Sequence, residues 1–114
     1  METHRLVLPG DLNHYGFLFG GRLLAWIDEA SWIAASLEYP QCQFVTVAMD
    51  TIEFYHSVRE GAILTIRCER TRQGTTSVTY AVNVWDFKAR PAPIFSTAVT
   101  FVRVDADGRK LPIA

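Results

Sequence analysis

The sequence predicts an α+β domain in which a curved antiparallel β-sheet wraps around one long central α-helix. A single stretch without helix breakers spans about four turns, and four alternating or β-branched stretches follow it, joined by short turns. One face of an antiparallel sheet must be covered, and this helix is the only cover available. The sheet is therefore expected to curve around the helix.

The length and composition fit one ordered domain. The chain has 114 residues, which supports one core but not two, so we expect residues 1–114 to form a single domain. Hydrophobic residues make up 49% and charged residues 20%, as in globular proteins, and the net charge of −1 argues against a general nucleic-acid binder. The polar N-terminus indicates no signal peptide, and no apolar run approaches the roughly 18 residues that span a bilayer. We expect a cytoplasmic protein with neither a membrane nor a nucleic-acid partner.

The first predicted elements are a short strand and a glycine-rich loop. Residues 5–8 alternate weakly between polar and apolar side chains, and Pro9-Gly10 then signals a turn. Residues 11–19 are predicted as a loop that leads into the helix.

The central helix is predicted from Arg22 to about Leu37, and Pro40 stops it because the residue before a proline avoids helical geometry. It begins at the glycine pair Gly20-Gly21. The first N–H groups of a helix have no partner within it and lie at the positive end of its dipole. At Gly20 and Gly21 they could bind a phosphate or polarise a carbonyl oxygen.

Asp28 lies on the flank of this helix. At about 100° per residue, the core-facing stripe consists of small and aliphatic side chains, namely Leu23, Ile27, Ala30 and Ala34. Glu29 falls on the solvent side, whereas Asp28 falls between the two sides, beside apolar and aromatic neighbours. A lone helical aspartate is most simply a surface residue, but its combination with Asn13 and the glycine pair favours a functional role.

Four further strands are predicted at residues 44–55, 63–70, 77–85 and 94–104. The apolar set of the first shifts register near Asp50-Thr51, which predicts a β-bulge or bend. A hairpin tip at residues 72–76 joins the second and third, and a proline-rich break at residues 90–93 precedes the last. A single sheet of this kind leaves exposed edges, so we expect a homodimer with a continuous sheet.

The stretch from Leu6 to Ala30 resembles the acyl-CoA thioester hydrolases of the hotdog fold, the bacterial and cytosolic acyl-CoA thioesterase group. The matching positions are Leu6, Leu8, Pro9, Asp11, Asn13, Tyr15, Gly16, Leu18 to Gly21, Leu23 to Trp26 and Asp28 to Ala30. The resemblance implies a hotdog fold, hydrolysis of an acyl-CoA to free CoA and a carboxylic acid, and no cofactor beyond the CoA of the substrate. It also implies homodimers that assemble further into hexamers.

The residues offer the groups that thioester hydrolysis needs. The N–H groups of Gly20 and Gly21 can stabilise an oxyanion, and Asp28 can act as general base or as nucleophile. Asn13 carries a neutral amide that can orient water or substrate. In related hotdog thioesterases the equivalents of Asn13 and Asp28 are the catalytic pair, typically contributed by opposite subunits, and the resemblance implies the same roles here. Taken alone, Asn13 could be a turn residue and the glycine pair a helix-packing device.

The predicted hairpin tip is the candidate site for CoA. Gly74 permits a turn whose N–H groups could face an anion, and Thr76 and Ser77 add hydroxyl donors. This resembles the Gly-x-Thr-Ser segment that contacts the nucleotide part of CoA in the family. Relatives commonly carry Arg where this chain has Thr75, so Arg72 or a residue of a neighbouring subunit is expected to contact phosphate. Without the resemblance the tip would be an ordinary polar hairpin.

Other catalytic machinery finds no support in the sequence. It has no Gly-x-Ser-x-Gly elbow, and no His/Cys/Asp cluster has metal-ligand spacing. Cys42 and Cys68 fit neither a metal site nor a disulfide framework, and His56 receives no role. One or two of the aromatic residues are expected to line an acyl tunnel, the candidates being Phe17, Phe19, Trp26, Trp32, Phe44 and Phe54.

Two other classes of function stay open. A non-catalytic acyl-CoA-binding or sensing hotdog module would bind CoA esters without turnover and would not need Asp28. An assembly protein, whose glycines only permit close packing, would have no affinity for CoA. Hotdog dehydratases rely on an Asp/His pair at the helix, and the predicted helix contains no histidine.

Overall fold

The computed structural model describes residues 1–89 and 91–114, and residue 90 of the predicted proline-rich break lies outside the described residues. A short 3₁₀ helix covers Pro9–Asp11. The main elements, in chain order, are β1 (Glu2–Leu6), α1 (Gly20–Glu38), β2 (Phe44–Phe54), β3 (Ile63–Gln73), β4 (Ser77–Asp86) and β5 (Phe95–Arg103). The predicted α+β class is confirmed.

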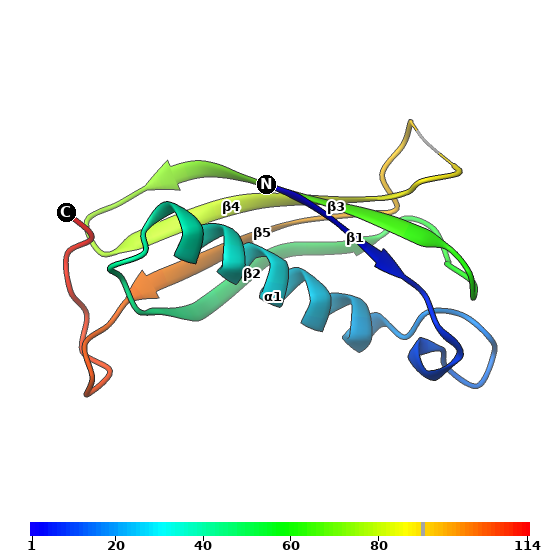
Figure 1. Ribbon diagram of the computed structural model, residues 1–114, viewed down its shortest axis with the longest axis horizontal. Helices are drawn as coiled ribbons and strands as arrows, with labels where there is room; N and C mark the ends of the chain where they lie inside the picture. Colours follow the sequence, from blue (N-terminus) through cyan, green and yellow to red (C-terminus); the bar gives the residue numbers. More distant parts are fainter. Residues whose placement is uncertain (90) are drawn as a thin grey trace.

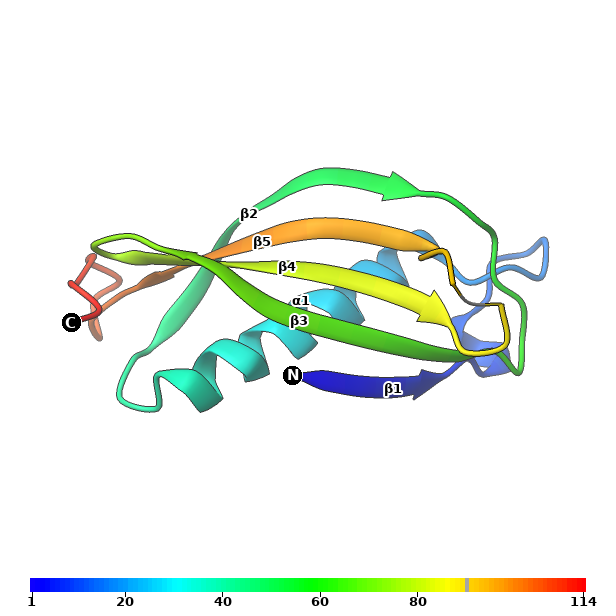
Figure 2. The same ribbon diagram turned by 90° about the horizontal axis from the view of Figure 1, so that it is seen from above.

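The strands form one antiparallel sheet in the order β1-β3-β4-β5-β2. Figure 1 shows α1 lying along one face of this sheet, and Figure 2 shows the strands side by side above the helix. β1 and β2 are therefore the two edge strands. No helix in the described part of the chain is long and apolar enough to cross a bilayer.

Two strand boundaries differ from the prediction. The first strand was expected at residues 5–8, but β1 occupies Glu2–Leu6, where each residue pairs with one of β3. β3 was expected to stop at Arg70, but it continues to Gln73 and pairs with β4 to the end. In both places the backbone ladder extends where both faces are largely exposed, so no apolar alternation marks it.

The predicted irregularity in β2 is confirmed. The register with β5 shifts between Asp50 and Glu53, and Thr51 has a φ of 58°. A positive φ is rare for a β-branched residue, so this is a true kink in the strand. It changes which side chains of the second half of β2 face the helix.

The core lies between α1 and the inner face of the sheet. The predicted stripe of Leu23, Ile27, Ala30 and Ala34 is buried, and Trp26, Ser31 and Ala35 are buried with it. The buried Ser31 hydroxyl donates to the Ile27 carbonyl at 2.7 Å. Full burial of a side chain such as Ile27 stabilises the fold by about 1.5–3 kcal/mol, so this stripe fixes the helix on the sheet.

Candidate active site

Asn13 shapes the loop that precedes α1. Its backbone N–H donates to the Phe17 carbonyl at 2.7 Å, while its Oδ1 accepts from the N–H groups of Tyr15 and Phe17 at 2.9 and 3.2 Å. Gly16 completes the turn with a φ of +86°. Asn13 is thus a turn residue, as its residue type suggests. Its side-chain nitrogen has no hydrogen bond to any described residue and stays available beside the cleft that Asn13 lines.

The start of α1 supplies free backbone donors. Phe19 precedes the helix in an extended conformation and offers no side-chain cap. The N–H groups of Arg22 and Leu23 both donate to the Phe19 carbonyl, at 3.0 and 3.2 Å. Within residues 1–89 and 91–114, the N–H groups of Gly20 and Gly21 have no hydrogen-bond partner. The predicted donors are therefore present.

The two glycines border different hollows. Gly20 lines the cleft that also contains Asn13, whereas Gly21 lines a separate hollow beside Asp11 and Arg22. A Cβ on Gly20 would lie 3.2 Å from Cζ of Phe54, but a Cβ on Gly21 would meet the Phe19 ring at an ordinary 3.5 Å. The prediction treated the pair as one unit, and the structure separates them.

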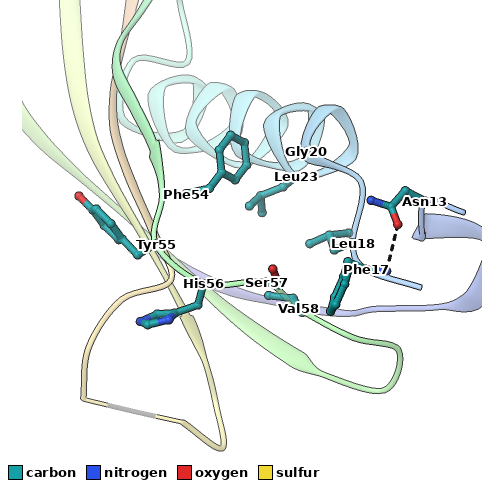
Figure 3. A pocket seen from close by; sticks show the side chains of 10 residues that line it. All are labelled: Asn13, Phe17, Leu18, Gly20, Leu23, Phe54, Tyr55, His56, Ser57 and Val58. Carbon is teal, nitrogen blue, oxygen red and sulfur yellow. Dashed lines mark hydrogen bonds between the residues drawn. The ribbon is translucent and has the colours of Figure 1, made fainter. Parts of the chain in front are cut away.

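The cleft beside Gly20 holds about 340 Å³ and has mainly apolar walls. Its apolar lining consists of Phe17, Leu18, Leu23, Phe54 and Val58. Figure 3 shows Phe54 and Leu23 directed toward each other, while the rings of Tyr55 and His56 point away. Of the six aromatic candidates for an acyl tunnel, Phe17 and Phe54 lie in this cleft.

The aromatic walls are themselves held in place. The Phe54 ring packs edge-on against Phe95 with centroids 4.9 Å apart. The Arg59 guanidinium lies 4.5 Å from the centroid of the Phe17 ring. These contacts give the cleft a defined shape beside the free N–H of Gly20.

Asp28 is half-buried on the flank of α1, as predicted, but it does not line this cleft. Thr46 of β2 donates a hydrogen bond from Oγ1 to Asp28 Oδ1 at 2.6 Å. Asp28 stands eight residues beyond Gly20, which is about 12 Å along a helix axis. One chain therefore does not bring Asp28 and Asn13 together. Glu29 is exposed, as expected, and pairs with Arg5 at 3.1 Å.

The contact of Thr46 with Asp28 was not predicted from the sequence. It lies in a strand rich in threonine and valine, where a threonine carries no special signal. Only the packing of the edge strand against α1 places its hydroxyl on the carboxylate.

The hairpin tip, defined in the structure as Gly74 to Ser77, is closed by a backbone hydrogen bond between its first and last residues. The Gly74 N–H donates to the Ser77 carbonyl at 2.8 Å, so the N–H groups of this turn that stay open to an anion are those of Thr75 and Thr76. Gly74 is needed for another reason, because a Cβ there would lie 2.9 Å from Ser77 Oγ. Thr75 and Arg72 are exposed. In both ribbon views the tip lies at the end of the molecule opposite the Asn13 loop.

The described residues contain no metal-binding cluster, and the thiol of the buried Cys68 has a raised pKa. Among the described residues, no group of three or more His, Cys, Asp or Glu side chains could hold a metal ion. Cys68 is buried, as predicted, and burial raises the pKa of its thiol to about 11. A thiol that stays protonated at neutral pH is a poor nucleophile.

Comparison with known proteins identifies the family. The thioesterase superfamily matches residues 15–92. The acyl-CoA thioester hydrolase YciA of Salmonella typhimurium is 30% identical, over 95% of this chain and 85% of that protein. Acyl-coenzyme A thioesterase 11 of Mus musculus is 33% identical over 74% of this chain, which spans only 14% of that protein.

Solved structures agree with this assignment. The hexameric thioesterase y2039 of Yersinia pestis has a TM-score of 0.88 at 28% identity, covering 96% of this chain and 91% of its own. The acyl-CoA hydrolase of Staphylococcus aureus, solved with butyryl-CoA and CoA, has a TM-score of 0.86 at 30% identity, covering 98% and 70%. Variants of that hydrolase carry alanine in place of a threonine, an aspartate or an asparagine.

A sheet wrapped around one helix, with free N–H groups at the helix start beside an apolar cleft, is the hotdog arrangement of a thioester hydrolase. The chain belongs to the thioesterase superfamily. The predicted fold, family and enzyme class, those of the acyl-CoA thioester hydrolase group, are confirmed.

Proposed function

We propose that the protein hydrolyses the thioester of an acyl-CoA to free CoA and a carboxylic acid, with Asn13 and Asp28 as its catalytic residues. One observation carries this proposal most directly. The unpaired N–H of Gly20 lies at the start of α1, beside a mainly apolar cleft that also contains the Asn13 amide. A thioester needs these two neighbours, a donor for its carbonyl oxygen and an apolar space for its acyl chain.

The chemistry follows from these groups. The carbonyl oxygen accepts hydrogen bonds at the helix start, where the loss of one such donor typically costs about 100- to 1000-fold in rate. As general base, Asp28 takes a proton from water positioned with Asn13, and the water oxygen bonds to the carbonyl carbon. The C–S bond then breaks, and the CoA thiolate leaves and takes up the proton. As nucleophile, Asp28 would instead form an anhydride that water hydrolyses.

The position of Asp28 supports a site shared between two chains. Asp28 lies beside β2, which has β5 as its only neighbour in the described part of the sheet. Apolar side chains on this edge strand are exposed, namely Val45, Val47, Ile52 and Phe54. A second copy bound along this edge would cover them and could bring its Asp28 to the Asn13 cleft. We propose a homodimer of this kind and, by analogy with the hexameric Yersinia enzyme, a hexamer assembled from such dimers.

The Staphylococcus variants support the assignment of the catalytic pair. The asparagine and the aspartate replaced there are separated along that chain by the same number of residues as Asn13 and Asp28. A threonine was also chosen for replacement in that enzyme. Thr46 follows Asp28 by 18 positions, against 17 for the threonine and aspartate replaced there. Its hydrogen bond to Asp28 gives a threonine a direct part in placing the carboxylate here.

We propose a separate binding site for each end of the substrate, the acyl chain and the CoA nucleotide. We assign the acyl chain to the Phe17–Phe54 cleft of one chain and the CoA nucleotide to the tip of a neighbouring chain, because the cleft and the tip of one chain lie at opposite ends. The proposed CoA-binding residues of the tip are Arg72, Gly74, Thr75, Thr76 and Ser77. The Staphylococcus hydrolase binds butyryl-CoA and CoA, which makes butyryl-CoA the first substrate to try. No cofactor beyond the CoA of the substrate is proposed.

The deciding experiment is thiol release from butyryl-CoA and longer acyl-CoAs, followed with a thiol-reactive dye. Wild type should release CoA, and Asp28→Asn should lose nearly all turnover while still folding and binding CoA. Unchanged turnover in Asp28→Asn would remove Asp28 from the mechanism. No release by wild type, with CoA esters still bound, would favour a sensing module instead.

A further inference from the structure

The hairpin tip is held from two sides by parts of the chain that lie far from it in sequence. One side is the segment 111–113, called the tail segment below. The other side is the C-terminal end of α1, which reaches the tip through Tyr39. Both contacts involve the residues that the proposed function assigns to CoA or their direct neighbours.

The tail segment binds the backbone of the tip. The Ile113 N–H donates to the Thr75 carbonyl at 2.9 Å, and the Ile113 side chain is 3% exposed. Leu111 donates its N–H to the Arg103 carbonyl, and the Arg103 guanidinium donates to the Pro112 carbonyl, both at 2.9 Å. Arg103 in turn donates its N–H to the Thr76 carbonyl at 2.8 Å. Both threonine carbonyls of the tip are thus occupied.

The end of the helix holds the residue before the tip. The Tyr39 hydroxyl donates to Gln73 Oε1 at 2.6 Å, and the Arg70 guanidinium donates to the same hydroxyl. Arg70 also lies 3.7 Å from Glu38, whose carboxylate accepts from the Tyr80 hydroxyl at 2.6 Å. Tyr80 is 1% exposed, so the network is anchored in the core.

These contacts determine what the tip can offer a ligand. A carbonyl oxygen repels a phosphate, and the carbonyls of Thr75 and Thr76 are turned to backbone N–H groups of the tail and of β5. The hydroxyl groups of the tip remain, together with the N–H groups of Thr75 and Thr76. Arg70 and Arg103 are engaged, whereas Arg72 has no ion pair among the described residues. Donors and one cation are left, which suits an anionic nucleoside phosphate.

We propose that Ile113, Tyr39 and Gln73 are positioning residues for the nucleotide of CoA, because they fix the tip with its donors outward. The inference rests on the proposed function for the identity of the ligand. It adds to that function two elements, the tail segment and the end of α1, that touch neither the cleft nor the thioester.

The test compares a ligand that has the nucleotide with one that lacks it. Butyryl-CoA and butyryl-pantetheine share the thioester, and CoA and pantetheine are the matching binding probes. Tyr39→Phe removes one hydroxyl and keeps the ring, and Ile113→Ala removes the buried anchor of the tail. Each should raise the Kd of CoA and the KM of butyryl-CoA roughly two- to tenfold, the value of about one hydrogen bond. The kcat for butyryl-CoA and all constants for the pantetheine ligands should not change.

Controls separate positioning from general destabilisation. Ile66→Ala truncates a similarly buried isoleucine on β3, where it pairs with β1. It should not change the ratio of the KM for butyryl-CoA to the KM for butyryl-pantetheine. Ile113→Val should restore the affinity for CoA. Equal effects on CoA and pantetheine ligands, or no effect on CoA, would overturn the inference even if hydrolysis is confirmed. Conversely, CoA binding that depends on Tyr39 and Ile113, without any hydrolysis, would support the tip and refute only the proposed reaction.

Discussion

Thr46 donates a 2.6 Å hydrogen bond to Asp28, and this contact joins the edge strand β2 to the central helix. It occupies one carboxylate oxygen and leaves the other without a partner in the described residues. The carboxylate is therefore oriented on its helix but still able to accept a proton or attack a carbon. The proposed base, Asp28, therefore lies directly beside the edge strand β2.

Replacing Thr46 by Val should lower kcat roughly 10- to 100-fold, since a hydrogen bond to a charged group contributes about 1.5–3 kcal/mol. KM should change little, because Thr46 contacts the carboxylate of Asp28 and lines neither the cleft of its own chain nor the tip. Thr46→Ser keeps the hydroxyl and serves as the matched control. Steady-state thiol release measures all three proteins, and equal rates in Thr46→Val and wild type would contradict the role.

Gly20→Ala should impair turnover more than Gly21→Ala. A Cβ on Gly20 meets the Phe54 ring at 3.2 Å and must displace the cleft wall, whereas Gly21 has room for one. We expect a loss in kcat/KM of roughly tenfold or more for Gly20→Ala, because small displacements in a catalytic site are costly. Gly21→Ala should raise the free energy of unfolding by about 0.5–1 kcal/mol through helix propensity. Thermal melts and rates of the two variants provide the comparison.

Mixing two inactive variants tests the shared site. Asn13→Ala and Asp28→Asn homodimers should each be nearly inactive. After unfolding, mixing in equal amounts and refolding, half of the dimers carry one variant of each kind, and one of their two sites contains both catalytic residues. Activity should then recover to about a quarter of wild type. If Asn13 and Asp28 act within one chain, the mixture will show no recovery.

Cys68 gives the fold a pH dependence above neutrality. Burial raises the pKa of its thiol from about 9 to about 11. Because the folded-state pKa is higher than the unfolded-state pKa, the buried neutral thiol contributes fully to stability below pH 9. This contribution is lost as the pH rises through 11. The free energy of unfolding should fall by up to about 3 kcal/mol over that range. Denaturant melts at pH 8 and pH 11 should show a smaller fall in Cys68→Ala, and equal falls would assign it to other groups.

The sequence predicts best those features that depend on side-chain periodicity. The buried stripe of α1 and the irregularity after Asp50 both correspond to patterns of apolar residues, whereas the end of α1 was predicted from a single residue type, the proline at position 40. β1 left little, because five residues of an edge strand carry two or three alternations at most.

The contacts between distant segments could not be predicted. The Thr46–Asp28 bond depends on how β2 packs beside α1, and neither residue signals the other. The bond from Ile113 to the Thr75 carbonyl uses backbone atoms only, so no residue type reveals it. The assignments of Asn13 and of the tip came from resemblance to a family, and the structure supplied their surroundings.

Because the apolar edge of β2 is exposed, the specific activity of the enzyme should depend on protein concentration. If two chains must meet along this edge, dilution below the dissociation constant separates Asn13 from the partner's carboxylate and uncovers Val45, Val47 and Ile52 at the same moment. Specific activity should then fall as the enzyme is diluted, and the separated chains should be the species most prone to aggregate. Assembly would therefore both complete the catalytic site and protect the exposed edge strand from aggregation.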